Sequence, residues 1–285
     1  MTLSFQFGTV GAPKSTPPKP GGSVGAIRRL AELSLDAFEL GWVQSVRVTA
    51  ATCAEIKRTS EEQSVSLSVH APYFINLNAD AEEWPKSRKR LMDAAVYGNL
   101  AGATDIIFHP GSYFGAPPEE VLPTAIQRLE DCLQELHAQD NPVRLRPETM
   151  GKSAMLGSLE DTLKMGQALP GVEPCIDFAH LHARAGDGSM NSYDEWARLL
   201  EQYGAALGAE ALKRLHIHLS GIEYSLKGER EHLPILDSDL DISAIFTALK
   251  AFGCQGRIFC ESPILEDDAQ FLRERWLEIS GEAPS

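Results

Sequence analysis

The feature that most constrains this chain is a regular alternation of short apolar segments with longer amphipathic ones. Each apolar segment is rich in Val, Ile, Leu and Phe and is bounded by Gly, Pro or polar residues, which is typical of buried β-strands. The intervening segments carry apolar residues at i, i+3 and i+4 spacing, which indicates helices. Strands are predicted at residues 3–9, 37–43, 65–71, 104–110, 143–149, 173–180, 214–220 and 256–262.

Eight alternations of strand and helix predict an α/β fold, a (β/α)₈ TIM barrel whose functional site lies at the C-terminal mouth. An open doubly wound sheet is the alternative, but it usually has fewer strands and a GxGxxG fingerprint after the first one. Here the first strand runs into GAPKSTPPKPGG, so residues 11–22 are expected to form the first barrel loop. Because composition does not break along the 285 residues, one domain is predicted over 1–285.

Imidazole and carboxylate side chains stand where these strands are predicted to end. The C-terminal ends of barrel strands converge on one mouth, so these residues are expected to meet in space. Burying so many polar groups without partners would be costly, and a metal ion would supply the partner. A ligand set of His, Asp and Glu without Cys favours Zn²⁺, with Mn²⁺ or Fe²⁺ as alternatives. The residues are His70, His109, Glu148, Asp177, His180, His216, His218 and Glu261.

The alternation of side chains along a strand refines this set. His216 and His218 are two residues apart and therefore point to the same side. His218 is nearer the mouth and is the better ligand, whereas His216 is expected one layer deeper, as a core residue or a hydrogen-bonding partner. Arg146 shares a face with Glu148 and is expected to lie beneath it and orient it.

Composition excludes some classes of function. The chain has 26 Lys and Arg and 40 Asp and Glu. The resulting formal net charge of −14 excludes a surface that is basic throughout. A bound polyanion would have to be held by a local positive field or by metal. Five Cys without a CxxC pair favour a reducing compartment. With no leader pattern and no stretch near the ~18 apolar residues of a membrane span, the protein is expected to be cytoplasmic.

The strand-end motifs resemble those of the endonuclease IV family, in the same order and over nearly the whole chain. They are VHAPYFINL, IIFHPGS, ETMGK, CIDFAH, HIHLSG and FCESP. That family is a (β/α)₈ barrel with three zinc ions. The resemblance implies a centre of two to three Zn²⁺ ions held by His70, His109, Glu148, Asp177, His180, His218 and Glu261.

The last pair of ligands departs from the family pattern. The family has D-x-H followed by a Gly-rich turn, whereas residues 228–241 of this chain read GEREHLPILDSDLD. His232 is expected to supply the imidazole, but Arg230 stands where the carboxylate is expected. Glu231 is predicted to replace it with a shifted backbone, with Glu229 as the alternative.

The resemblance implies an apurinic/apyrimidinic endonuclease that cleaves the phosphodiester 5′ to abasic sites in damaged double-stranded DNA. Glu148, Asp177 and Glu261 would be its catalytic residues. Tyr73 and Phe74 occupy the place of the family's intercalating pair, although packing on the barrel rim is the alternative. The wider superfamily contains sugar isomerases and epimerases. A metal-dependent sugar or sugar-phosphate isomerase or epimerase is therefore the alternative function, and the acidic charge and the missing turn favour it. A metal-binding barrel without activity is a third class.

Overall fold

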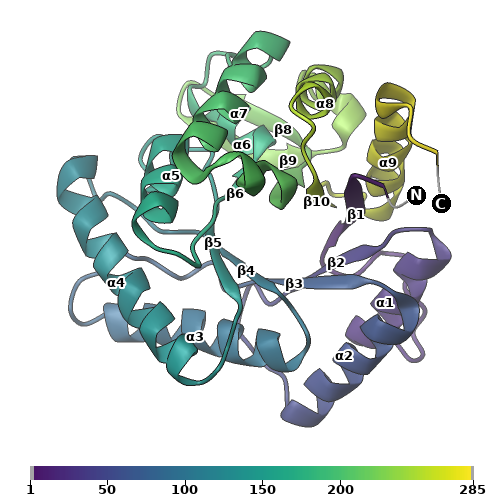
Figure 1. Ribbon diagram of the computed structural model, residues 1–285, viewed down its shortest axis with the longest axis horizontal. Coiled ribbons are helices and arrows are strands. Elements are labelled where there is room, and N and C mark those ends of the chain that lie inside the picture. Colours follow the sequence, from purple (N-terminus) through teal and green to yellow (C-terminus); the bar gives the residue numbers. More distant parts are fainter. Residues whose placement is uncertain (1–2, 284–285) are drawn as a thin grey trace.

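The computed structural model describes residues 3–283, and their parallel strands form a ring surrounded by helices (Figure 1). The ring strands are β1 (Phe5–Val10), β2 (Ala37–Gly41), β3 (Ser66–His70), β4 (Asp105–Phe108), β5 (Arg144–Pro147), β6 (Cys175–Asp177), β7 (Leu215–Leu219) and β10 (Gly256–Cys260). They pair in the order β5-β4-β3-β2-β1-β10-β7-β6. Isolated parallel bridges Leu145–Val172 and Glu148–Cys175 join the β5 and β6 segments. The predicted (β/α)₈ barrel is confirmed.

The helices cover the outside of the ring. Strands β4 and β7 are buried along their whole length because the barrel interior covers one face and helices cover the other. Among residues 3–283, no helix has the length and apolar character needed to cross a membrane. The helices are α1 (Gly22–Glu32), α2 (Ala50–Gln63), α3 (Trp84–Leu100), α4 (Pro118–Ala138), α5 (Leu159–Ala168), α6 (Phe178–Arg184), α7 (Tyr193–Leu207), α8 (Ile242–Ala251) and α9 (Glu266–Ser280), with 3₁₀ turns η1 (Ala209–Lys213) and η2 (Ile235–Asp237).

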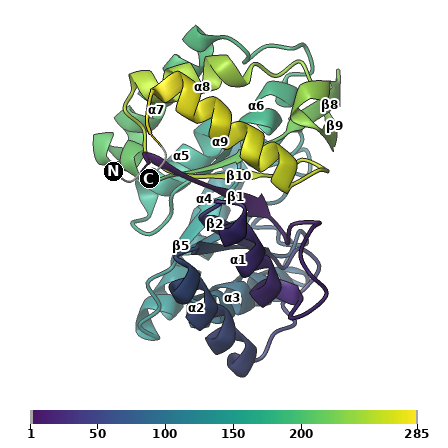
Figure 2. The same cartoon turned by 90° about the vertical axis from the view of Figure 1, so that its right-hand side faces the viewer.

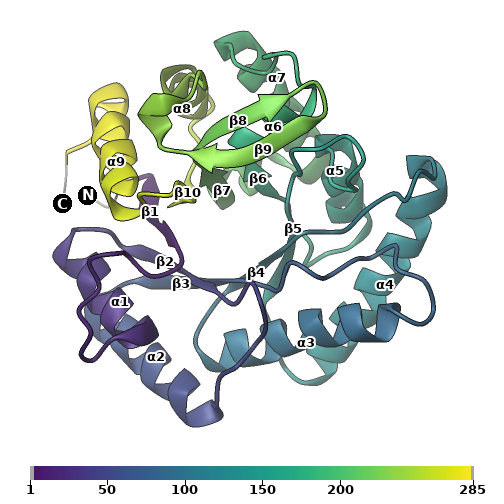
Figure 3. The same cartoon turned by 180° about the vertical axis from the view of Figure 1, so that it is seen from behind.

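An antiparallel hairpin, β8 (Gly221–Ser225) and β9 (Gly228–Leu233), is inserted between β7 and α8. It pairs outside the barrel sheet and lies over the ring in the view of Figure 3. Figure 2 shows it at the end of the barrel opposite the two termini. The hairpin was not among the predicted strands. It places residues 229 and 232 at the mouth.

Strand β6 is shorter than the predicted segment 173–180. The Asp177 side chain accepts a hydrogen bond from the backbone N–H of His180 at 2.7 Å and caps α6, which begins at Phe178. This early turn brings His180 onto the same side as Asp177.

The expected role of Arg146 is wrong. Its guanidinium is buried and donates to Asp105 Oδ1 at 2.5 Å and to the carbonyl oxygens of Pro174 and Arg214. Asp105 begins β4, so these bonds draw Arg146 toward the end of the barrel opposite the mouth. Arg146 therefore does not orient Glu148.

Candidate metal centre at the barrel mouth

The strand-end residues come together in ligand groups that adjoin one another. Within each group, one imidazole nitrogen or carboxylate oxygen of every member lies within 4.8 Å of the others. The first group is His70, His109 and Glu148; the second is Glu148, Asp177, His218 and Glu261; the third contains Asp177, His180 and His232.

In the first group, two imidazoles face one carboxylate oxygen. His70 Nε2 lies 3.2 Å and His109 Nε2 lies 3.4 Å from Glu148 Oε2. The Nδ1 atom of His70 is 2.9 Å from the carbonyl oxygen of Ala71, to which it can only donate. In a neutral His70, Nε2 therefore presents a lone pair to an anionic oxygen. This arrangement requires a proton or a cation between the two atoms.

The second group contains buried polar atoms without hydrogen-bond partners. Within residues 3–283, nothing hydrogen-bonds Glu148 Oε1, Asp177 Oδ2 or His218 Nδ1. His218 Nδ1 lies 3.5 Å from Glu261 Oε1 and 3.7 Å from Glu148 Oε1. Buried polar atoms in proteins are normally satisfied, so these three atoms fit a site for a cation.

A residue that the sequence analysis did not single out orients this group. Glu39 is fully buried on β2 and accepts hydrogen bonds from His218 Nε2 at 3.0 Å and His216 Nε2 at 2.7 Å. The Ser68 hydroxyl donates to the same carboxylate at 2.7 Å. Burial opposes its ionisation, but the two histidines hold the pKa of Glu39 far below its usual value. The bond to Nε2 leaves Nδ1 of His218 free to face the second group.

His216 occupies the deeper layer expected for it. Burial lowers the pKa of His216 to about 4, so this histidine is neutral and donates to Glu39. A carboxylate in the middle of the otherwise apolar segment AFELG is the sequence feature that could have drawn attention to Glu39.

In the third group, two imidazole nitrogens face each other. His180 Nδ1 donates to the carbonyl oxygen of Thr149 at 2.9 Å, and His232 Nδ1 donates to that of Glu261 at 3.2 Å. Their Nε2 atoms are 3.2 Å apart. If both rings are neutral, their Nδ1 hydrogens are used in these bonds and two lone pairs face each other across this gap, which calls for a proton or a cation between them. A hydrogen bond from the other ring nitrogen to a carbonyl oxygen is typical of metal-ligating histidines.

The structure selects Glu229 rather than Glu231 as the carboxylate beside this pair. Glu229 Oε2 lies 3.8 Å from His180 Nε2, whereas Glu231 is exposed. The pairings Glu223–Glu231 and Tyr224–Glu229 leave Arg230 as the extra residue of a β-bulge. The bulge brings Glu229 and His232 to the same face, and it directs Glu231 away. The prediction that Glu231 is the nearby carboxylate is wrong for this reason.

The electrostatics of the metal-free centre reflect its crowded carboxylates. Burial, together with repulsion from Glu148 and Glu261, raises the pKa of Asp177 to about 6, although His180 opposes the shift. Burial alone would lower the pKa of His180, but Asp177 and Glu148 raise it well above its ordinary value. The centre therefore binds protons in place of another positive charge. The donor set and the unpartnered atoms fit transition-metal ions such as Zn²⁺.

The centre opens into a cavity of about 330 Å³ lined in part by Tyr73, His109, His180, Glu229 and Glu261. The Tyr73 ring stacks on His109 with ring centres 5.0 Å apart. Tyr73 is 44% and Phe74 57% exposed, so the predicted pair lies at the edge of the centre and not in the core. Arg90 lies over the Phe74 ring and donates to its carbonyl oxygen at 2.9 Å.

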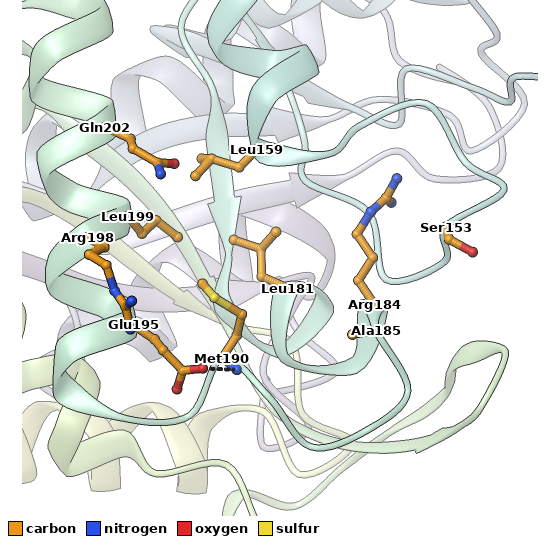
Figure 4. Close-up of a pocket in the computed structure, with 10 residues that line it drawn as sticks. All are labelled: Ser153, Leu159, Leu181, Arg184, Ala185, Met190, Glu195, Arg198, Leu199 and Gln202. Carbon is orange, nitrogen blue, oxygen red and sulfur yellow. Dashed lines mark hydrogen bonds between the residues drawn. The ribbon is translucent and has the colours of Figure 1, made fainter. Parts of the chain in front are cut away.

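A larger cavity, of about 600 Å³, lies outside the barrel against α5, α6 and α7 (Figure 4). Its floor includes Leu159, Leu181 and Leu199. Its carboxylate, Glu195, already accepts hydrogen bonds from backbone N–H groups at the start of α7. No residue of the three ligand groups lines this cavity.

The fold and the site together define a (β/α)₈ barrel with imidazole and carboxylate side chains, candidate metal ligands, clustered at its mouth. The sequence profile described as xylose isomerase-like TIM barrel matches residues 27–275. The chain belongs to this family.

Curated relatives include both uncharacterized and nuclease proteins. An uncharacterized protein of Methanocaldococcus jannaschii is 38% identical over 274 residues, which cover 96% of this chain and 97% of that protein. Endonuclease 4 of Thermus thermophilus is 28% identical over 203 residues, covering 69% and 71% of the two chains. A probable endonuclease 4 of Staphylococcus carnosus is 30% identical over 58% of this chain, and the match spans only 55% of that relative.

Solved structures with the same fold include proteins named for two different activities. Endonuclease IV from Thermus thermophilus has a TM-score of 0.69 at 21% identity and covers 95% of this chain and 99% of its own. A D-tagatose 3-epimerase-like protein also has a TM-score of 0.69, at 19% identity, and covers 91% and 96%. These likenesses concern the fold alone.

Proposed function

We propose that this protein is a metal-dependent endonuclease that cleaves the phosphodiester 5′ to abasic sites in duplex DNA. The observation that carries the proposal is that three ligand groups adjoin one another, the first and second sharing Glu148 and the second and third sharing Asp177. A sugar isomerase of this superfamily typically needs one metal between two carboxylates, and the imidazoles of His109, His180 and His232 exceed that need. The relatives named endonuclease 4 further support it.

The residues would divide among three ions. When bound, Zn²⁺, or Mn²⁺ or Fe²⁺ in its place, would stabilise the charge of a phosphodiester and lower the pKa of a bound water. The first ion would be held by His70, His109 and Glu148, the second by Glu148, Asp177, His218 and Glu261, and the third by His180, Glu229 and His232.

The protein's own catalytic contribution would come from Asp177, Glu148 and Glu261. Asp177 Oδ2 is buried and has no donor among the described residues, so it would hold the second ion and orient the attacking water by accepting a hydrogen bond from it. Glu148 and Glu261 lie 3.7 and 3.5 Å from His218 Nδ1, and together with it they would hold the second ion beside the reacting phosphate. Three divalent ions would carry more charge than the four carboxylates around them, so the loaded centre would attract a phosphodiester in spite of the net charge of −14.

Tyr73 and Phe74 would contact the substrate at the rim. An abasic nucleotide in a duplex must leave the stack before it can reach a centre enclosed in a barrel mouth. Exposed aromatic side chains beside the centre can stack on the bases left behind and offset the cost of opening the duplex. The cavity of about 330 Å³ is within the range typical of small-ligand sites, which suits one extruded nucleotide.

A metal-dependent sugar isomerase or epimerase is the second candidate. The same cavity volume suits a monosaccharide, and the net charge of −14 disfavours contact with a long polyanion. In that reaction, Glu148 and Glu261 would move a proton to and from a substrate carbon.

One experiment separates the two functions. Metal-loaded protein is incubated with an end-labelled duplex that contains one abasic analogue and, separately, with ketohexoses. We expect a single cut 5′ to the lesion, no epimerised sugar, and at least a 100-fold slower cut by Asp177→Asn. Intact duplex together with a new ketose would overturn the proposal in favour of the epimerase.

A further inference from the structure

The third ligand group is built differently from the other two. Its Glu229 and His232 come from hairpin β8–β9, whereas the first two groups lie on or directly after barrel strands. The side chains of Glu229 and His232 are 20% and 24% exposed, while those of Glu148 and His218 are fully buried. The position of the third group therefore depends on how the hairpin docks on the barrel.

The hairpin docks on Gly151, in the loop after β5. The backbone N–H of Glu229 donates to the carbonyl oxygen of Gly151 at 2.9 Å. A Cβ atom at position 151 would lie 2.7 Å from both Cβ and Oε2 of Glu229 and 3.2 Å from Cδ2 of His180. Gly151 does not have the left-handed backbone that favours glycine, so the close approach is what excludes a side chain here.

Arg184 fixes the same loop from the other side. Its Nη1 donates to the carbonyl oxygens of Met150 and Lys152 at 2.8 and 2.7 Å, and its Nη2 donates to that of Met155 at 3.0 Å. Figure 4 shows the Arg184 side chain extending from α6 toward the loop that carries Ser153. Among residues 3–283, no carboxylate forms a salt bridge with Arg184, so backbone carbonyls are its partners. The guanidinium thus holds residues 150–155 against the hairpin.

We propose that Gly151, held by Arg184, is a positioning residue that sets the carboxylate of the third metal site. The inference rests on the metal centre of the proposed function. Because the barrel strands hold the first two groups independently, the third ion is lost alone when a methyl group at position 151 pushes Glu229 away. Loss of Arg184 is expected to weaken the third site as well, because without its three hydrogen bonds the loop no longer supports the hairpin.

The test is metal content per folded chain, measured by plasma mass spectrometry on full-length protein, with circular dichroism and Tm recorded on the same samples. We expect three ions in the wild type and two in Gly151→Ala. Gly41→Ala is the matched control, because Gly41 ends β2 at the same mouth and a Cβ there meets only Gly11, at 3.4 Å. This control is expected to keep three ions.

A second variant tests the inference in case Gly151→Ala does not fold. Arg184→Lys keeps the charge but cannot donate to three carbonyls, and we expect its third ion to dissociate about 10–100-fold more readily in a chelator titration. The inference is overturned if Gly151→Ala folds and still holds three ions. If Gly151→Ala does not fold, the inference is overturned when Arg184→Lys binds the third ion as tightly as the wild type. A wild type with two ions would overturn this inference alone, whereas a wild type with one ion or none would remove the proposed metal centre itself.

Discussion

Glu39 links two histidines of the barrel interior through a single carboxylate, and only one of them faces the ligand groups. Glu39→Gln keeps the shape of the side chain, but its amide nitrogen cannot accept a hydrogen bond. We therefore expect His218 to lose its fixed orientation and metal affinity at the second group to fall about 10–100-fold, as a competitive chelator titration would measure. Ser68→Ala is the control, because Ser68 contacts Glu39 without touching metal ligands. Equal affinities for Glu39→Gln and wild type would show that Glu39 is only a core residue.

Glu229 and Glu231 form a natural pair for a second test. Glu229 faces His180, and Glu231 is exposed two residues away on the same strand. Glu229→Gln should remove one ion per chain because an amide is a much weaker ligand than a carboxylate, whereas Glu231→Gln should remove none. Metal analysis of the two purified variants measures the difference. The reverse result would restore the assignment expected from the sequence.

At this scale the sequence predicted which side chains meet at the mouth where a strand ends, and it did so poorly elsewhere. His70, Asp177 and His218 follow from the place of a polar residue at the end of an apolar segment. Glu39 was missed because it lies inside its segment. Glu229 was not preferred because a β-bulge at Arg230 changes the alternation of side chains, and nothing in the letters GEREHL marks that bulge.

At the scale of elements, the loop after β3 gives the most specific prediction about DNA. Tyr73 and Phe74 are exposed at its start, while Ile75 and Leu77 are buried. If the exposed pair replaces the extruded nucleotide in the stack, the double variant Tyr73→Ala/Phe74→Ala should cut an abasic duplex at least 10-fold more slowly and an abasic single strand nearly as fast as wild type. The reason is that only the duplex has a stack to open.

The control for this variant is Phe114→Ala, which removes an aromatic ring that is 70% exposed in the next mouth loop. Equal losses on duplex and single strand would assign Tyr73 and Phe74 to rim packing, and a lowered Tm would accompany that result.

The barrel strands and the hairpin differ in how far they could be predicted. Seven of the barrel strands fall within their predicted segments and β1 extends one residue beyond its own, because burial on both faces requires continuous apolar runs. The hairpin GIEYSLKGEREHL is largely polar and lies partly exposed over the mouth, so no such run marks it. The element that completes the third ligand group is thus the one that hydrophobic pattern could not reveal.

For the whole molecule, the clustered titratable groups predict how stability depends on pH. In metal-free protein the pKa of Asp177 is raised to about 6, and burial alone would lower those of His70 and His180 but neighbouring carboxylates raise them. Each of these groups stabilises the fold fully below its unfolded pKa, and the contribution is lost as pH rises through the folded value. The Tm of metal-free protein should therefore fall as the pH rises, through Asp177 from pH 3.8 to about 6 and through His70 and His180 from pH 6.5 upward.

His216, with its pKa lowered to about 4, acts in the opposite direction and destabilises the fold below about pH 6.5. Metal-loaded protein should behave differently above neutral pH, because deprotonated ligands bind metal more tightly. Calorimetry of both forms over the same pH series measures the contrast. Parallel Tm curves for the two forms would contradict a metal centre at these residues.

The central claim is that three adjoining ligand groups at the barrel mouth hold metal ions, and anomalous diffraction at the zinc edge tests it most directly. We expect three peaks in crystals of zinc-loaded protein: one among His70, His109 and Glu148, one among Glu148, Asp177, His218 and Glu261, and one among His180, His232 and Glu229. A map of zinc-loaded protein with at most one peak at these side chains would contradict the claim.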